Sequence, residues 1–302
     1  MTTVAALNDR FAIKGQLSFE QGPDGFIFID VRNRFATARL TPQGAQVINW
    51  APLNERPVIW LSRAAKFVNG KSIRGGVPIC WPWFGPHASE ASFPGHGYAR
   101  TVMWEVSETE ALPDGRTRLV FRLQENDTTR KQWPHRTPVE CRVTLGATLE
   151  IELATRNAED KPITISEALH TYFEVGDISK VKVIGLEDTD YLDKVDGGQR
   201  KRQQGAVTIS GEVDRVYLDS RTECIIDDPV MQRRIHIAKR GSASTVVWNP
   251  WVEKANKMGD LGEDGYRHML CVESGNAAEN TVTMAPGESH QMWVSYRVER
   301  IG

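Results

Sequence analysis

Residues 139–155 read VECRVTLGATLEIELAT, and this stretch decides the fold class. Apolar and polar side chains alternate through both of its halves, which is the period-two pattern of strands with one buried face. The short connection Leu145-Gly146-Ala147 separates the two halves. The stretch therefore predicts two antiparallel strands that are joined as a β-hairpin.

The same alternation recurs on both sides of the hairpin, with turn signals such as Asp114-Gly115 between the segments. Residues 127–133 and 255–260 are the best candidates for helices, and both are short. A dozen or more strands in one chain predict an all-β fold in which large antiparallel sheets pack face to face. The other expected strands are residues 26–31, 35–40, 117–123, 181–185, 206–210, 233–239, 244–248, 268–274, 280–284 and 290–298.

The balance of charges excludes several classes of partner. The 302 residues carry 37 Lys and Arg against 39 Asp and Glu, so the formal net charge at pH 7 is −2. Such a chain has no positive field over the whole protein that would gather nucleic acid or an anionic membrane. We therefore expect no nucleic-acid partner and no membrane partner. Any phosphate that the protein binds must be held by a local site.

The cysteines and the start of the chain indicate where the protein works. The four cysteines lie tens of residues apart, without the paired spacing of a metal or redox site. The first 15 residues lack the pattern of a signal peptide, and no apolar run reaches the ~18–20 residues that cross a bilayer. We therefore expect a cytoplasmic protein. We expect reduced, mostly buried thiols at Cys80, Cys141, Cys224 and Cys271.

The sequence also bears on domain organisation. It contains no linker rich in proline or serine, no block of like charges and no internal repeat. Residues 1–302 are therefore expected to form a single domain, with its core in about residues 25–300. Nothing in the sequence constrains the oligomeric state, and we favour a monomer.

Residues 73–100 break the strand pattern and contain the first candidate site. They read IRGGVPICWPWFGPHASEASFPGHGYAR, a long loop rich in glycine, proline and aromatic residues, and such loops in β proteins tend to bind ligands. Arg74 and Arg100 lie near its two ends. Two guanidinium groups could form a fork for a phosphate or a carboxylate. The alternative is that both arginines form surface salt bridges.

Aromatic and histidine side chains of this loop are further candidates. Trp81, Trp83 and Phe84 could pack on the apolar face of a sugar ring, or they could belong to the core. Trp83 and Phe84 have the stronger claim, because a glycine and a proline follow them and keep that backbone out of a sheet. His96 lies between two glycines and could carry a proton near neutral pH, or it could be a structural histidine.

Three more candidates lie outside the loop. His170 follows an apolar strand pattern in EALHTYFEV, where burial could fix its tautomer and lower its pKa. Glu273 ends the apolar run MLCV, and a carboxylate at such a place is costly without a partner or a function. Asp214 lies in VDRVYLD, and its alternative role is a salt bridge with an arginine.

The same histidines and carboxylates could belong to two other kinds of site. Two histidines and a glutamate can form a catalytic metal centre, but the sequence contains no His-x-His and no His-Glu-x-x-His. A serine hydrolase is disfavoured because Gly-x-Ser-x-Gly is absent. We expect no metal and no cofactor.

Five motifs occur in this order along the chain: RGGVPICWPWFGP (74–86), HGYAR (96–100), ALHTYFEVGDI (168–178), DRVY (214–217) and CVESGNA (271–277). Together they resemble the glucose-6-phosphate 1-epimerase (hexose-6-phosphate mutarotase) branch of the aldose 1-epimerase superfamily. The resemblance extends from about residue 30 to residue 297. It implies an antiparallel β-supersandwich of the galactose-mutarotase type, with the sugar bound in a cleft on one sheet.

The resemblance also implies roles for individual residues. By motif position, His170 and Glu273 are expected to transfer protons. Some relatives carry a glutamine just before the histidine that corresponds to His96. This chain has Gly95 there, so a side-chain contact is lost or supplied by water. The substrate implied is a small sugar phosphate. The residues expected to bind it are Arg74 and Arg100 for the phosphate, Asp214 for a sugar hydroxyl, and His96 for positioning the ligand.

The chemistry of anomer exchange explains these residue types. A proton has to leave the anomeric hydroxyl while another reaches the ring oxygen, so that the ring opens to an aldehyde. We expect Glu273 to be the base and His170 the acid, with their roles exchanged when the ring closes on the other face. Glu273 then has to be ionised and His170 protonated, a state that their mutual attraction would favour.

Three other functions stay open at this point. The first is a non-catalytic carbohydrate-binding β-sandwich, which would need the aromatic and arginine side chains but not the acid and the base. The second is a mutarotase for unphosphorylated aldoses. The third is a glycoside hydrolase, in which Asp214 and Glu273 would be the two carboxylates across the scissile bond.

Overall fold

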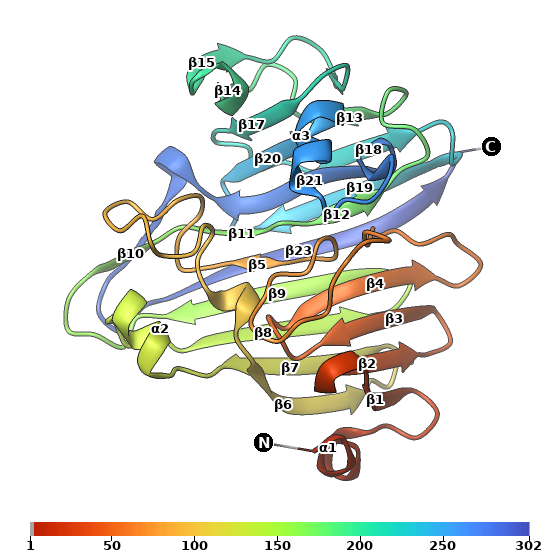
Figure 1. The fold of residues 1–302 in the computed structure, drawn as a ribbon, viewed down its shortest axis with the longest axis vertical. Coiled ribbons are helices and arrows are strands. Elements are labelled where there is room, and N and C mark those ends of the chain that lie inside the picture. Colours follow the sequence, from red (N-terminus) through yellow and green to blue (C-terminus); the bar gives the residue numbers. More distant parts are fainter. Residues whose placement is uncertain (1–2, 302) are drawn as a thin grey trace.

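Antiparallel sheets dominate the structure, a computed structural model that describes residues 3–301 (Figure 1). The strands of this part of the chain form sheets of nine, eight, four and two strands. Every pairing between these strands is antiparallel, as in the hairpin of β8 (Val139–Leu145) and β9 (Thr148–Arg156). The prediction of an all-β fold built from large antiparallel sheets is confirmed.

The nine-stranded sheet contains the hairpin from which the fold class was predicted. In that hairpin Leu145 pairs with Leu149, and Val143 pairs with Ile151. Alternate side chains of β9 are buried, so its period-two pattern reflects one covered face. The order of the sheet is β16 (Val207–Thr208), β13 (Lys182–Ile184), β18 (Cys224–Asp228), β19 (Arg233–Arg240), β23 (Ser289–Arg300), β9, β8, β7 (Thr117–Leu123) and β6 (Trp104–Ala111).

The eight-stranded sheet is covered on both faces at its centre. Every residue of its two central strands, β20 and β21, is buried. A further short strand, β12 (Tyr172–Glu174), also pairs with β21. The order of the sheet is β15 (Gln199–Arg202), β14 (Asp190–Asp193), β17 (Val213–Tyr217), β20 (Ser244–Asn249), β21 (Met269–Asn276), β11 (Glu167–Leu169) and β5 (Ile79–Cys80).

Two smaller sheets complete the β structure. The first lies next to the N-terminal helix in Figure 1, and the second is a short ribbon. The first consists of β1 (Leu17–Gln21), β2 (Ile27–Arg32), β3 (Ala36–Thr41) and β4 (Gln46–Pro52), and the second of β10 (Ile163–Ile165) and β22 (Val282–Met284).

The helices are short, and two of them differ from expectation. α2 (Asp127–Gln132) lies where the sequence predicted it. α3 (Trp251–Met258) begins four residues earlier than predicted, directly after Pro250, and ends at Gly259, whose left-handed conformation stops the helix. α1 (Val4–Phe11) was missed, because it buries only Leu7 and Phe11 and so shows little apolar periodicity.

One hydrophobic core connects the sheets. It includes Trp50 of the four-stranded sheet, Val247 of the eight-stranded sheet and Ile151 of the nine-stranded sheet, and it extends from Leu7 to Tyr296. The single domain over residues 1–302 stays a prediction, and residues 1, 2 and 302 lie outside the described part. All four cysteines are free and buried, which confirms that prediction. Within residues 3–301 no helix is both long and apolar enough to span a membrane.

Candidate active site

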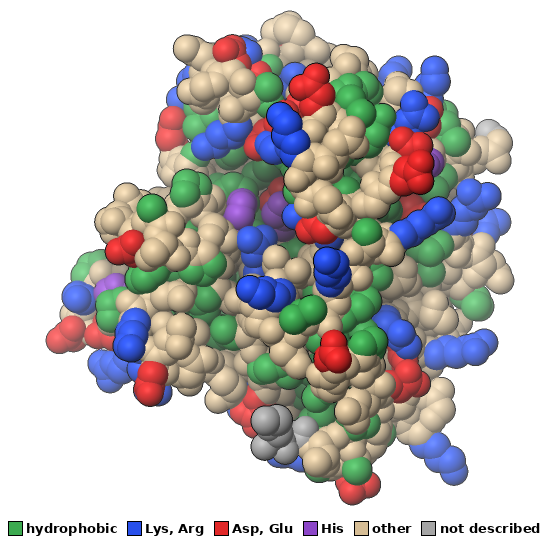
Figure 2. Space-filling view, viewed as in Figure 1, with side chains coloured by type: hydrophobic (Ala, Val, Ile, Leu, Met, Phe, Trp, Pro, Cys, Tyr) green, Lys and Arg blue, Asp and Glu red, His purple; other side chains and the backbone are tan. Residues whose placement is uncertain are grey.

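A cavity of about 530 Å³ opens on the eight-stranded sheet, a volume in the range of small-molecule sites. Its wall combines the residue 73–100 loop with β17, β20, β21 and α3. Figure 2 shows a hollow on this face in which histidine and basic side chains gather. Seven of the eight predicted site residues line it, namely Arg74, Phe84, His96, Arg100, His170, Asp214 and Glu273.

Trp83 is the predicted residue that does not line the cavity. Its ring stacks against Phe93 with centroids 6.2 Å apart, and its indole N–H donates to the carbonyl of Pro94 at 3.0 Å. Its exposed fraction is 8%, and it belongs to the main core. The core alternative therefore fits this side chain. Its neighbour Phe84 packs edge-on against His96 inside the cavity, with centroids 4.8 Å apart.

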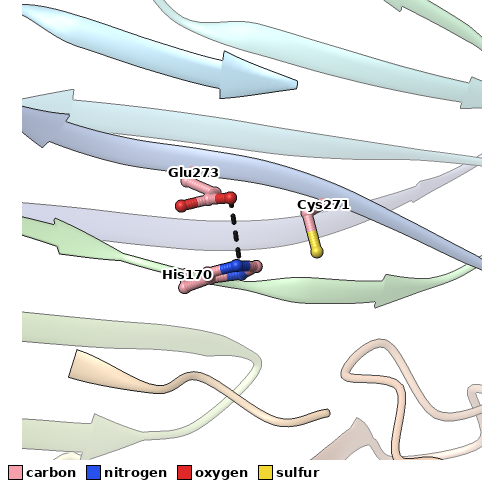
Figure 3. Close-up of side chains that lie close together, drawn as sticks. All are labelled: His170, Cys271 and Glu273. Carbon is pink, nitrogen blue, oxygen red and sulfur yellow. Dashed lines mark ion pairs between the residues drawn. The ribbon is translucent and has the colours of Figure 1, made fainter. Parts of the chain in front are cut away.

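A break between two strands places His170 opposite Glu273. β11 pairs with residues 274–276 of β21, and β12 pairs with residues 269–271. Residues 170–171, between β11 and β12, face the part of β21 that contains Glu273. The N–H of Thr171 donates to the carbonyl of Leu169 at 2.8 Å in a tight turn. The histidine thus leaves the sheet ladder and its ring projects beside the carboxylate (Figure 3).

His170 and Glu273 form a close buried pair. Nδ1 of His170 lies 3.4 Å from Oε1 of Glu273, and the side chains are 11% and 1% exposed. The geometry at this distance is not that of a hydrogen bond. Nδ1 of His170 and Oε2 of Glu273 are buried without a hydrogen-bond partner among the described residues. Buried polar atoms are normally satisfied, so these two unsatisfied atoms mark the pair as a candidate functional site.

The protonation of this pair differs from the sequence-based expectation. Burial raises the pKa of Glu273 well above its usual range, and the nearby Asp214 raises it further. Burial also lowers the pKa of His170 well below its usual range, with help from His96, Arg100 and Arg74. In the protein alone, desolvation therefore outweighs the mutual attraction of the two charges, and a neutral carboxylic acid beside a neutral imidazole is favoured.

The two arginines in the cavity are held in different ways. Nε of Arg74 donates to Oδ1 of Asp260 at 3.0 Å, and its Nη1 donates to the hydroxyl of Tyr172 at 2.9 Å. Arg100 donates from Nη2 to the carbonyl of Gly95 at 2.8 Å, and among residues 3–301 no carboxylate lies within ion-pair distance of it. The guanidinium of Arg100 can therefore take an anion without giving up a protein counter-ion.

Two glycines allow the loop backbone to pass close to other backbone segments. Gly75 has φ +114°, and a Cβ there would lie 2.6 Å from the carbonyl oxygen of Trp60. Gly97 has φ +72°, and a Cβ there would lie 1.9 Å from the carbonyl oxygen of Trp81. Only glycine fits these positions, and both lie directly beside site residues. The glycine-rich pattern therefore positions Arg74 and His96.

His96 is a neutral hydrogen-bond donor in this environment. Burial and the charge of Arg100 lower the pKa of His96 to about 4. The backbone N–H of Gly85 donates to its Nδ1 at 3.3 Å, so the proton of the neutral ring resides on Nε2. This residue can donate one hydrogen bond to an oxygen in the cavity but does not supply a positive charge, which suits a ligand-positioning group.

Asp214 shares its side of the cavity with two lysines that the sequence analysis missed. Burial raises the pKa of Asp214, while Lys254 and Lys194 lower it. Lys254 of α3 donates to Oε1 of Glu212 at 2.7 Å, and Lys194 lies on the turn after β14. Both lysines line the cavity. No motif marked them, because they come from segments about 60 residues apart in the sequence.

The cavity also bears on metal binding. His170, Cys271 and Glu273 present ligand atoms that all lie within 4.8 Å of one another (Figure 3). Nitrogen, sulfur and oxygen donors of this kind suit zinc. However, the residues that line the cavity include His170 and Glu273 but not Cys271, and burial raises the pKa of the Cys271 thiol, which opposes the thiolate that a metal requires. The arrangement fits an acid–base pair better than a metal centre.

Comparisons with known proteins point in one direction. Residues 28–297 match the family described as aldose 1-epimerase. A protein of Escherichia coli (strain K12) that is provisionally named glucose-6-phosphate 1-epimerase is 40% identical over 238 residues, which cover 78% of this chain and 79% of the relative. At the level of sequence, the similarity therefore includes most of both chains.

Solved structures show the same similarity. The crystal structure of YeaD from Salmonella typhimurium, provisionally named a mutarotase, superposes with a TM-score of 0.89 at 34% identity and covers 96% of both chains. A galactose mutarotase-like protein from Lactobacillus casei has a TM-score of 0.68 at 15% identity, covering 90% of this chain and 100% of that one. The second likeness concerns the fold alone, and it confirms the expected galactose-mutarotase type of fold.

Proposed function

The chain belongs to the aldose 1-epimerase family, and we propose that it interconverts the α and β anomers of glucose 6-phosphate. Membership of this family makes it an isomerase. One observation carries the choice of substrate: the unsatisfied His170–Glu273 pair shares a single cavity with Arg74 and Arg100. An acid–base pair suits the anomeric end of a sugar, and two guanidinium groups suit its phosphate.

Ring opening assigns one proton transfer to each member of the pair. Glu273, ionised, takes the proton of the anomeric hydroxyl, while His170, protonated, gives a proton to the ring oxygen. The bond between the anomeric carbon and the ring oxygen breaks, and its electron pair stays on that oxygen while the anomeric C–O bond becomes the aldehyde C=O. Rotation about the bond next to the aldehyde and the reverse transfers then close the ring as the other anomer.

The buried environment suits this exchange because both states of the pair carry the same net charge. When the ring has opened, Glu273 holds a proton and His170 is neutral, which is the state that burial favours in the protein alone. The ion-paired state has to form when the cyclic sugar binds. A sugar hydroxyl that donates to the carboxylate, and a phosphate that offsets the charges of Arg74 and Arg100, both favour that state.

The other lining residues provide specificity in this proposal. Asp214 accepts hydrogen bonds from sugar hydroxyls, and His96 donates one from Nε2. Phe84 covers an apolar part of the sugar. Trp83 supports this wall from the core, where its indole already has an acceptor. The assignment of each residue is supported by its place in one cavity and by its position in the sequence motifs.

The proposal includes a monomeric, single-domain protein of the cytoplasm that acts on a small sugar phosphate. The nearly balanced charge of −2 supports the absence of nucleic-acid and membrane partners. A local site with two arginines then accounts for phosphate binding in a chain without a strong overall field.

Nuclear magnetic resonance exchange between the two anomers of glucose 6-phosphate tests the function. The purified wild-type protein is expected to exchange them far faster than water does. The same sample is assayed for cleavage of glycosides and for equilibrium binding of the sugar phosphate. Binding without accelerated exchange would favour a carbohydrate-binding protein, and cleavage of a glycoside would favour a hydrolase. Exchange of free glucose that is as efficient as that of glucose 6-phosphate would indicate a mutarotase for unphosphorylated aldoses.

A further inference from the structure

The ring of His170 is held by aromatic packing. It lies against the ring of Tyr172 with centroids 4.9 Å apart and an interplanar angle of 9°. Trp248 packs edge-on against both rings, at 5.8 Å and 6.0 Å. Tyr172 is in turn stacked with Trp60 at 5.8 Å and 20°. Since Nδ1 of His170 has no hydrogen-bond partner among the described residues, these rings set the orientation of the imidazole.

The hydroxyl of Tyr172 connects this aromatic stack to Arg74. It accepts a hydrogen bond from Nη1 of Arg74 at 2.9 Å, while Nε of Arg74 is bound to Asp260 at 3.0 Å. A guanidinium group has five N–H donors, so three remain for a ligand. Tyr172 is 2% exposed and yet lines the cavity. One buried side chain therefore touches both the candidate phosphate-binding group and the candidate acid.

We infer that Tyr172 is a positioning residue that links Arg74 to His170, so that Arg74 supports turnover as well as phosphate binding. The inference rests on the proposed function and deepens it. It also gives the two arginines different roles, although the sequence analysis assigned both to the phosphate. Arg74 is joined to the acid through Tyr172, whereas Arg100 is held by the carbonyl of Gly95.

The charges around the pair support the same link. After burial and His96, the groups that lower the pKa of His170 are Arg100 and Arg74. A phosphate dianion bound to these arginines offsets their charge and so favours the protonated imidazole that ring opening requires. Phosphate bound at the arginines therefore prepares the acid, and the Tyr172 hydroxyl keeps Arg74 and the imidazole in a fixed relation while it does so.

The first test replaces the hydroxyl and keeps the ring. Tyr172→Phe is expected to lower kcat for glucose 6-phosphate about threefold to tenfold, the effect of one net hydrogen bond, with a smaller change in KM. Tyr172→Leu also removes the stack and is expected to lower kcat about a hundredfold, because misplacing a catalytic group by about 1 Å can cost that much. The matched control is Tyr217→Phe, which removes the bond from a buried tyrosine to Gln203 (2.8 Å) outside the cavity and should leave kcat unchanged.

The second test uses free glucose, which has no phosphate to bind. If Tyr172 links Arg74 to the acid, Arg74→Lys, which keeps the positive charge but not the two-bond geometry of the guanidinium, lowers kcat for glucose as well, and by about the same factor as Tyr172→Phe. The double variant should then lose no more than the stronger single variant, because both changes break one connection. Additive losses, or a Tyr172→Phe protein that differs from wild type only in KM, would overturn the inference.

A readout that does not depend on turnover separates this inference from the proposed function. The imidazole nuclear magnetic resonance signals of His170 and their pH titration should change in Tyr172→Phe and stay as in wild type in Tyr217→Phe. Unchanged signals in Tyr172→Phe would contradict the link even if the enzyme is active. A wild-type protein that does not accelerate anomer exchange would instead contradict the proposed function, and the titration would still decide the link.

Discussion

Two histidine–glutamate pairs, each with a buried carboxylate, lie on opposite faces of the same two strands, and they behave differently. In the cavity, His170 and Glu273 approach to 3.4 Å. Behind the sheet, Nε2 of His290 lies 2.9 Å from Oε1 of Glu167. β11 contains Glu167 and ends directly before His170. β21 contains Glu273 and Asn276, which bonds to Glu167. Glu273 and Asn276 lie an odd number of residues apart in the strand, so their side chains face opposite sides of the sheet.

The hydrogen-bond partners account for the difference between the pairs. Oε1 of Glu167 also accepts a bond from Nδ2 of Asn276 at 3.0 Å. Burial lowers the pKa of His290, but its bond to Glu167 and the charge of that carboxylate outweigh this, so the pKa is raised. Oε2 of each glutamate is buried without a hydrogen-bond partner among the described residues, so the contrast arises at Oε1 and at the histidine.

The charges around each pair point the same way. Arg74 and Arg100 face the cavity pair and disfavour a protonated His170, and the carboxylate of Asp214 disfavours an ionised Glu273. The pair behind the sheet has an amide donor instead. Identical residue types thus favour a protonated histidine in one place and a neutral histidine in the other, and the surroundings decide which.

The largest expected effect comes from removing the transferable proton. Glu273→Gln is expected to lower the rate of anomer exchange by about 10²–10⁴-fold, the usual contribution of a general acid or base. Its stability should change little or increase, because the buried carboxyl of Glu273 has an oxygen without a hydrogen-bond partner. The measurements are nuclear magnetic resonance exchange for activity and urea unfolding for stability.

Glu167→Gln is the matched control for that variant, because it makes the same replacement on the other face of the sheet. It should leave the exchange rate within about threefold of wild type, since Glu167 does not line the cavity. Exchange by Glu273→Gln at the wild-type rate would exclude this carboxylate as the base. Equal losses of activity in both variants would indicate a general disturbance of the sheet.

The next effect concerns the charges that face the cavity pair. Arg100→Ala is expected to raise KM for glucose 6-phosphate about tenfold to a hundredfold, the cost of a charge-assisted hydrogen bond of roughly 1.5–3 kcal/mol. KM for free glucose should change at least tenfold less. The variant should also raise the pKa of His170, because one of the charges that lower it is gone. Equal changes for both sugars would show that Arg100 supports the structure rather than the phosphate.

The sequence predicted many of the longer strands, including the fully buried β20 and β21, but it missed β6 and some very short strands. β7 and β8 have the bounds expected from their alternation. β5 and β11, of two and three residues, are buried throughout and show no alternation that could reveal them. The motifs indicated that His170 and Glu273 act together. The sequence did not show that the break after β11 places the two side chains opposite each other.

The same reasoning explains the partial prediction of the site. Motifs identified residues whose neighbours in the sequence are unusual, such as Arg74 beside two glycines. Tyr172 and Lys254 line the cavity because distant segments meet there, and their local sequences look like an ordinary strand and an ordinary helix. Trp83 is the opposite case: its local pattern is conspicuous, but the pattern does not reveal that its side chain packs in the core. The protonation of the pair also needed the structure, since burial decided it.

A smaller effect is expected from breaking the ion pair behind the sheet. Glu167→Gln should destabilise the fold by roughly 1.5–3 kcal/mol, because the charge-assisted bonds from His290 and Asn276 are weakened in a buried place. Urea unfolding followed by tryptophan fluorescence measures this loss. Unchanged stability would mean that the amide replaces the carboxylate fully, and the contrast between the two pairs would then not rest on charge.

The smallest effect is the pH dependence of stability that His290 contributes. The pKa of His290 is raised in the folded state above the value of about 6.5 for an unperturbed histidine. The stability that it contributes is therefore complete below about pH 6.5 and is lost as the pH rises through the raised folded-state pKa. The free energy of unfolding of wild type should exceed that of His290→Gln most at about pH 6, and the difference should shrink towards about pH 9. A difference that stays constant over this range would mean that His290 is neutral and that its bond to Glu167 is not an ion pair.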